Sequence, residues 1–199
     1  RVGSVMAETL CEAGYDLALS YRHSRAEAEA LAARCEAKRP QSCLLLPLDL
    51  SDTGALSPFI ERVVAHYGRI DALINNAAVY EPIPIAEASD QQILGAIGTN
   101  LTGPILCARA AIPMMGRGSH IINVSSESVE MRFPFFVLYQ GSKAGLERFS
   151  EGLNHELDPS GIKVTLVRAG QMIEEGKMPA GDPGMRMRFA QAALAAGLD

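Results

Sequence analysis

The chain has 199 residues, of which 48% are hydrophobic and 21% charged, and its net charge is −5 at pH 7. This balance is typical of a globular protein and excludes a disordered chain, while the length suits one domain with one core. No block of Lys or Arg stands out and no apolar run approaches the ~18 residues that a membrane helix needs, so we expect neither a nucleic-acid nor a membrane partner.

Short apolar runs alternate along the chain with longer amphipathic stretches, and this pattern predicts strands separated by helices. In chain order we expect a helix over 4–13, a strand over 15–21, a helix over 24–38, a strand over 43–48, a helix over 52–68, a strand over 71–74, a helical region over 89–115 interrupted at Pro104, a strand over 120–124, a helix over 137–157 and a strand over 162–167. The alternation predicts an α/β fold with a doubly wound, mostly parallel sheet in three layers.

Ligands of such sheets bind beyond the carboxyl ends of the strands, so the residues at those points are candidates. Arg22 follows the first strand, where a basic side chain accommodates a 2′-phosphate and an acidic one favours a free ribose hydroxyl. We therefore expect recognition of NADP there, with a solvated arginine as the alternative. Ser24 could cap the next helix and reach the same phosphate. Asp49, after the second strand, could accept a hydrogen bond from adenine or hold the following turn.

Two further strand ends carry polar residues. After the third strand, Asn75 and Asn76 precede the small residues Ala77 and Ala78, which would let the backbone approach a ligand closely. An ordinary Asn-rich turn is the alternative interpretation. After the fourth strand come Ser125 and Ser126.

Tyr139 and Lys143 share one face of the predicted helix over 137–157, because residues four apart are neighbours on a helix. An ammonium beside a phenol lowers the pKa of the phenol from about 10, which makes it a suitable general acid or base. A surface pair is the alternative. Ser126, thirteen residues before Tyr139 at a strand end, favours the chemical interpretation.

Together these residues resemble the short-chain dehydrogenase/reductase family over residues 1–172, and in particular its pteridine reductases and 3-oxoacyl-acyl-carrier-protein reductases. The matching elements, in order, are Asp49, Asn75-Asn76-Ala77, Asn100, Ser126 and Tyr139-x-x-x-Lys143. The resemblance implies a Rossmann-type fold and an NADP(H)-preferring oxidoreductase that interconverts a carbonyl and a secondary alcohol by hydride transfer. Its substrate would be a small molecule such as a 3-oxoacyl thioester or a pteridine.

The resemblance also implies catalytic roles. Tyr139 would exchange a proton with the substrate oxygen, and Ser126 would hydrogen-bond that oxygen. Lys143 would lower the pKa of Tyr139 and hold the nicotinamide ribose. Asn100 would kink its helix and hold a water in a proton relay to Lys143.

The implied cofactor contacts lie along the whole chain. Gly3 matches the last glycine of the turn that cradles the pyrophosphate, and Arg1 stands at the middle glycine's position, where it would support Arg22 at the 2′-phosphate. The remaining implied contacts are Ser24, Asp49 at adenine, Asn75 and Ala77 in the cofactor loop, Tyr139, Lys143, and Gly170 in the turn after the last strand, where Ala169 replaces the family's proline.

Neither the family's first strand nor its last is recognisable, so we expect a single domain over 1–199 that is incomplete at both ends relative to the family. Met and Phe residues over 131–136 and 172–189 suit an apolar substrate pocket, with a subunit interface as the alternative. The resemblance implies a homodimer or homotetramer. The scattered Cys11, Cys35, Cys43 and Cys107 suggest buried thiols in a reducing cytoplasm and no metal site. The alternative function is a non-catalytic NADP(H)-binding regulatory protein, motivated by the incomplete phosphate turn.

Overall fold

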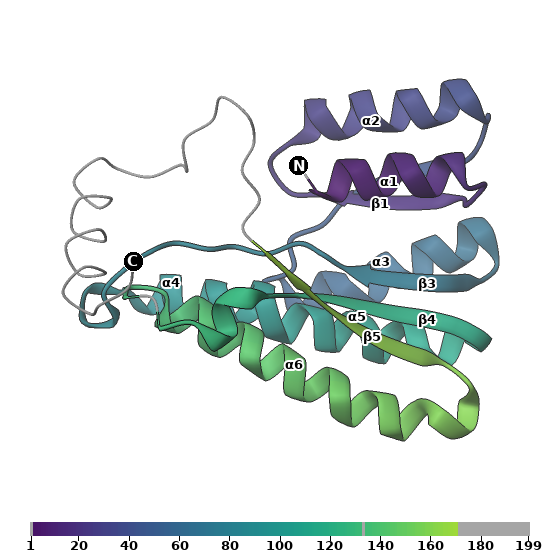
Figure 1. Ribbon diagram of the computed structural model, residues 1–199. Coiled ribbons are helices and arrows are strands. Elements are labelled where there is room, and N and C mark those ends of the chain that lie inside the picture. Colours follow the sequence, from purple (N-terminus) through teal and green to yellow (C-terminus); the bar gives the residue numbers. More distant parts are fainter. Residues whose placement is uncertain (1, 133, 171–199) are drawn as a thin grey trace.

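Helices and strands alternate along residues 2–132 and 134–170, the part of the chain that the computed structural model describes (Figure 1). The strands are β1 (Leu17–Tyr21), β2 (Cys43–Pro47), β3 (Ile70–Asn75), β4 (Met115–Ser126) and β5 (Lys163–Ala169). The α-helices are α1 (Val2–Glu12), α2 (Arg25–Lys38), α3 (Thr53–Tyr67), α4 (Asp90–Ile97), α5 (Gly103–Ala111) and α6 (Val137–Leu157). Shorter helical turns are η1 (Ile85–Glu87), η2 (Gly98–Thr102), η3 (Ile112–Met114), η4 (Glu127–Glu130) and η5 (Asp158–Ser160).

All strand pairs are parallel, and the α/β fold class is confirmed. We expected one sheet, however, and the described strands form two: β1 pairs with β2, and a second sheet has the order β3-β4-β5. Strands β1 and β3 are edge strands of their sheets. In the described residues no hydrogen-bonded pairing joins β1 to β3.

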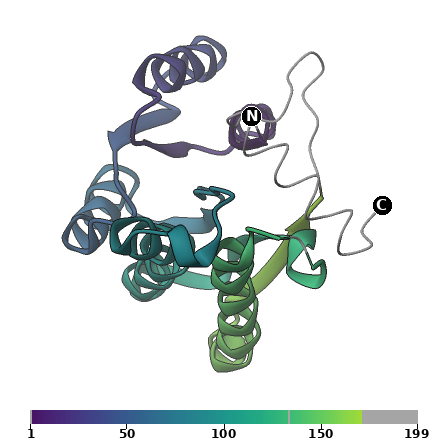
Figure 2. The ribbon, with the colours of Figure 1, turned by 90° about the vertical axis from the view of Figure 1, so that its left-hand side faces the viewer.

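Helices cover both faces of the strands, as the three-layer prediction requires. Figure 2 shows α1 and α2 on one face and α3, α5 and α6 on the other. The larger core cluster lies on the α3, α5 and α6 side and includes Leu46, Ile60, Ala108, Ile121 and Leu153. None of the described helices is long and apolar enough to cross a membrane.

The cysteines are free thiols, and Cys11, Cys35 and Cys107 are buried, as their interpretation as small apolar side chains predicts. Cys11 and Cys35 belong to a second cluster between α1, α2 and β1. Burial raises the pKa of Cys107 to about 11 and that of the half-buried Cys43 to about 12. Thiols with such pKa values are poor nucleophiles near neutral pH, so their role is packing.

The long helical region differs from its prediction. Its interruption is the π-helical turn η2, which ends just before α5, and strand β4 already begins at Met115. Pro104 lies in the first turn of α5 and has no N–H to donate to the carbonyl of Asn100, four residues earlier. Gly103 is needed here because a Cβ would lie 3.0 Å from the Cβ and the carbonyl oxygen of Leu50. The irregular turn therefore lets the helix pass close to the loop after β2.

Candidate active site

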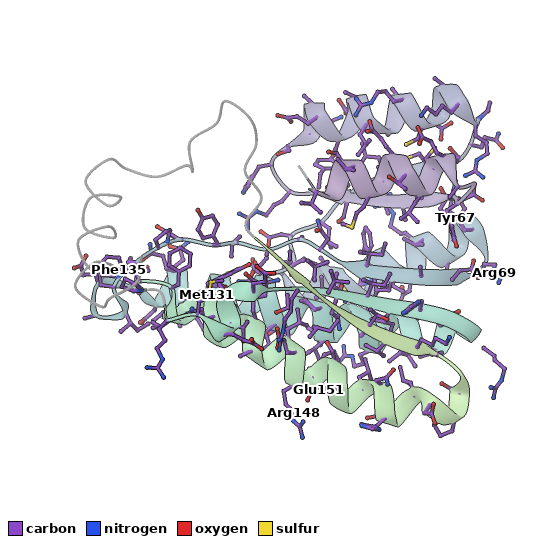
Figure 3. All side chains as sticks on the ribbon, viewed as in Figure 1. Tyr67, Arg69, Met131, Phe135, Arg148 and Glu151 are labelled. Carbon is purple, nitrogen blue, oxygen red and sulfur yellow. The ribbon has the colours of Figure 1, made fainter. Side chains whose placement is uncertain are left out.

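The carboxyl ends of the parallel strands lie at one end of the molecule. Asn75 and Ser126 are the last residues of the neighbouring strands β3 and β4. Figure 3 shows Met131 and Phe135 at this end and Tyr67 and Arg69 at the opposite one. The strand-end rule thus gathers the predicted catalytic residues on one side of the fold.

Ser126 and Tyr139 are joined by a hydrogen bond, which by itself lowers the pKa of Tyr139. The Ser126 hydroxyl also accepts a hydrogen bond from the backbone N–H of Ser128 at 3.2 Å. Because the oxygen accepts that amide proton, its own proton remains available for donation. The serine is therefore oriented by the turn that follows β4.

Lys143 lies one helical turn after Tyr139 and is 2% exposed. Its Nζ donates a hydrogen bond to the carbonyl oxygen of Val124 at 2.7 Å and lies 5.9 Å from the centroid of the Tyr139 ring. Burial lowers the pKa of Lys143 to about 8. The structure thus brings Ser126, Tyr139 and Lys143 together, as the sequence predicts.

We expected Lys143 to lower the pKa of Tyr139, and this expectation is wrong for the geometry of the structure. Burial raises the pKa of the phenol above its ordinary value, and the nearby phenol of Tyr80 raises it further, against the lowering by Ser126. The Lys143 amine is directed at the Val124 carbonyl and does not offset this burial. A raised pKa keeps Tyr139 protonated at neutral pH and suits it to donate a proton.

Asn100 lies in the π-helical turn η2 and is fully buried. Its Oδ1 accepts from the Val79 backbone N–H at 2.9 Å, and its Nδ2 donates to the Val79 carbonyl at 2.8 Å and to Ser142 Oγ at 3.1 Å. Ser142 precedes Lys143 on α6. The side chain therefore joins the loop after β3 to the helix that carries the catalytic candidates.

Asn75, which the resemblance expects to support the cofactor loop, is the last residue of β3. It is buried, and its Nδ2 donates to Asn123 Oδ1 at 2.8 Å, while Asn123 Nδ2 donates to Ser150 Oγ at 2.8 Å. This chain of amides links β3, β4 and α6. Ala77, two residues later, is exposed at the strand end. Asn75 thus supports the loop from below.

The predicted coenzyme residues of the first sheet lie beside one another. Arg22 Nη1 is 3.6 Å from Asp49 Oδ1, and both side chains are 40% exposed. Asp49 Oδ1 also accepts from the backbone N–H and hydroxyl of Ser51, at 2.9 and 2.6 Å, and these bonds lower the pKa of Asp49. Asp49 therefore holds the turn after β2, the alternative left open by the sequence. Ser24 is the N-cap residue of α2, but its side chain makes no capping bond.

The remaining predicted positions lie at the two ends of the chain. Gly3 is in the first turn of α1, where a Cβ would lie 2.9 Å from Asn76 Nδ2. A Cβ on Gly170 would lie 3.0 Å from Glu127 Oε2. Both glycines thus allow close packing at the candidate site. Arg1, Phe133 and the Met and Phe residues over 172–189 lie outside the described residues.

Sequence reasoning missed three residues near the site. The ring of Tyr80 lies edge-on to Tyr139, with centroids 6.0 Å apart, and stacks on Phe136 at 5.7 Å. Glu147 bonds to Ser125 and Arg168 beside Ser126. The spacing of Glu147, four residues after Lys143, could have placed it on the same helix face. No local signal indicates Tyr80 or Arg168.

Comparison with known proteins agrees with this geometry. Residues 2–179 match the family described as short chain dehydrogenase. Among relatives, an uncharacterized oxidoreductase of Methylorubrum extorquens is 31% identical over 94% of this chain, and a 3-oxoacyl-[acyl-carrier-protein] reductase of Staphylococcus aureus is 30% identical over 87%. The crystal structure of a short chain dehydrogenase from Burkholderia cenocepacia in complex with NADP matches 94% of the chain with a TM-score of 0.84 and 26% identity.

The chain is shorter than the proteins that it matches. It spans 75% of the Methylorubrum protein, 71% of the Staphylococcus reductase and 76% of the Burkholderia chain. It spans 61% of two uncharacterized oxidoreductases of Schizosaccharomyces pombe, with which it shares 33% identity.

Proposed function

The chain belongs to the short-chain dehydrogenase family, and we propose that it interconverts a carbonyl and a secondary alcohol with a nicotinamide dinucleotide. The observation that carries this proposal is the cluster of the half-buried Ser126 and Tyr139 with the buried Lys143 at the carboxyl end of β4. A buried ammonium is costly for stability, and groups with shifted pKa values are typical of catalytic sites.

The described residues fit a phosphorylated dinucleotide. Gly3 has no side chain in the first turn of α1, so a pyrophosphate could approach the backbone of that turn closely. Arg22 is partly exposed and Ser24 has a hydroxyl without a capping bond, so both have donors for a 2′-phosphate. Asp49 would meet the adenine. When bound, the nicotinamide supplies or accepts the hydride.

The protein's own residues handle the proton. Ser126 would donate a hydrogen bond to the substrate oxygen and keep its proton, because its own oxygen already accepts the Ser128 N–H. Tyr139 Oη would give its proton to that oxygen in reduction and take it back in oxidation. The ammonium of Lys143 is held at the Val124 carbonyl. It would place a positive charge near Tyr139 when the phenol loses its proton.

We further propose that NADPH is preferred over NADH. Arg22 stands directly after β1 and no acidic residue occupies that strand end. Replacing Arg22 by Ala should raise the KM for NADPH about tenfold, the value of one charge-assisted hydrogen bond, and leave the KM for NADH unchanged. Equal catalytic efficiency of the wild type with both coenzymes would contradict this preference.

The substrate side is apolar. Tyr80 and Phe136 stack on each other next to Tyr139. Met131, in the same stretch between β4 and α6 as Phe136, is 44% exposed. We propose an apolar carbonyl substrate such as a 3-oxoacyl thioester. The alternative is a dihydropteridine, which is polar and would be reduced at a carbon–nitrogen double bond. Turnover with acetoacetyl thioester and with a dihydropteridine would distinguish them.

The central test compares the wild type with Tyr139→Phe and with Tyr15→Phe as the matched control far from the site. Oxidation of NADPH is followed with a panel of ketones, aldehydes, thioesters and dihydropteridines. Loss of the proton donor should lower kcat at least about a hundredfold, whereas the control should match the wild type. A fully active Tyr139→Phe would refute the mechanism. Nucleotide binding with no turnover of any carbonyl by the wild type would instead indicate a regulatory protein.

A further inference from the structure

A buried carboxylate joins two strands and a helix directly beside Ser126. Glu147 lies on α6, four residues beyond Lys143, and its side chain is 9% exposed. Its Oε1 accepts hydrogen bonds from Ser125 Oγ at 2.7 Å and from Arg168 Nε at 3.0 Å. Its Oε2 accepts from Arg168 Nη2 at 2.7 Å. Ser125 precedes Ser126 in β4, and Arg168 lies in β5.

The contact between Arg168 and Glu147 uses two parallel N–H···O bonds, which fixes both position and direction. Arg168 and Ser125 hold the pKa of Glu147 below its ordinary value, so the carboxylate is charged at neutral pH. Arg168 also pairs with Glu130 in η4, the turn that directly follows Ser126. The cluster therefore holds in place both Ser125, which precedes Ser126, and the turn η4, which follows it.

Stability alone gives a weak reason for this cluster, because apolar residues of similar size often replace a buried ion pair at no cost. The need for a rigid geometry next to a reacting group is a stronger reason for the cluster. We propose that Glu147 and Arg168 are positioning residues that hold Ser126 against Tyr139, acting through Ser125 and through Glu130. This proposal rests on the proposed function and deepens it.

A second contact between α6 and β5 offers a matched control. Asn154 Oδ1 accepts the backbone N–H of Val164 at 3.0 Å. This bond joins the same helix to the same strand, but Asn154 is eleven residues beyond Lys143 and does not touch Ser125. A purely structural role for Glu147 predicts that breaking either contact has similar effects.

The side chains of Glu147 and Tyr139 both titrate, and each faces polar or charged groups from neighbouring elements. Glu147 faces Ser125 from β4 and Arg168 from β5. Tyr139 faces Ser126, Lys143 and Tyr80. Because the Ser126 hydrogen bond lowers the pKa of Tyr139, a displaced Ser126 should raise that pKa further.

The experiment compares the wild type with Ser125→Ala, Glu147→Gln and Asn154→Ala. The pKa of Tyr139 is measured from phenolate absorbance as the difference from Tyr139→Phe, and kcat and KM are measured with an accepted carbonyl. Ser125→Ala and Glu147→Gln should raise the pKa of Tyr139 and lower kcat about tenfold, as expected of a slightly misplaced catalytic group, with KM changed less than about twofold. Asn154→Ala should leave both quantities unchanged.

An unchanged pKa and kcat in Ser125→Ala would overturn the proposal, as would equal changes in Asn154→Ala. Ser125→Ala removes a single hydroxyl, so it decides the matter even if Glu147→Gln fails to fold. The absorbance titration needs no turnover. A wild type that reduces no carbonyl would therefore refute the proposed function and still leave the positioning role open to measurement.

Discussion

Lys143 carries a stability cost that can be measured directly. Its pKa falls from 10.5 to about 8 because the amine is buried. At 1.36 kcal/mol for each tenfold change, this fall corresponds to about 3 kcal/mol against the charged form. The hydrogen bond from Nζ to the Val124 carbonyl, 2.7 Å long, offsets roughly 1.5 kcal/mol of that cost. Replacing Lys143 by Met should therefore stabilise the fold by roughly 1–2 kcal/mol at neutral pH.

The sign of the pH dependence follows from the lowered pKa. Below pH 8 the lysine is charged in both the folded and the unfolded chain, so the cost is fully present. Between pH 8 and 10.5 the unfolded chain binds more protons than the folded one, so the wild type gains stability as the pH rises. The advantage of Lys143→Met should shrink over this interval and reverse above it, because the wild type recovers the whole cost of about 3 kcal/mol.

Urea unfolding of the two proteins at about pH 7 and about pH 10 tests this reasoning, because it gives the free energy of unfolding directly. Lys143→Met should be more stable at the lower pH and should have lost turnover. A variant that is equally stable or less stable at neutral pH, with no change in the difference as the pH rises, would refute the assignment of Lys143 as a buried cation.

Two further substitutions test other parts of the fold. Asn100→Ala removes three buried hydrogen bonds to Val79 and Ser142 and should lower the free energy of unfolding by about 3 kcal/mol; a loss below about 1 kcal/mol in urea would show that the clamp is unimportant. Tyr67→Phe removes a hydroxyl that donates to the Leu17 carbonyl and accepts the Leu44 N–H, both at 3.0 Å, and should cost about 1–2 kcal/mol with an unchanged kcat/KM, whereas a loss of activity would contradict its place far from the site.

Much of the fold could be predicted because local signals act over a few residues. Asp52 caps α3 because its carboxylate accepts the Gly54 N–H, and Gly68 ends the helix with a φ of 77°, which glycine adopts readily because it has no Cβ. Strand β4 is the counterexample, since it begins at Met115 and we expected it at His120. Its first residues include two glycines and a charged residue, and only pairing with β3 makes them a strand.

The site was predictable in its members and less so in its contacts. Tyr139 and Lys143 share a helix face because their spacing fixes it, but the spacing does not show that Lys143 is directed at the Val124 carbonyl. Burial, which raises the pKa of Tyr139, is a property of the packed molecule. Asn75 likewise bonds to Asn123, a partner forty-eight residues away that no local pattern indicates.

The middle position of β4 in its sheet determines how rarely this strand opens. Strand β4 is hydrogen-bonded to a neighbour on each side, whereas β3 and β5 each have one bonded neighbour in the described residues. Amide hydrogens of β4 should thus exchange with deuterated water more slowly than those of β3 and β5, because freeing this strand breaks two ladders at once. Ser126, the last residue of β4, is then held by the most slowly opening strand of the three.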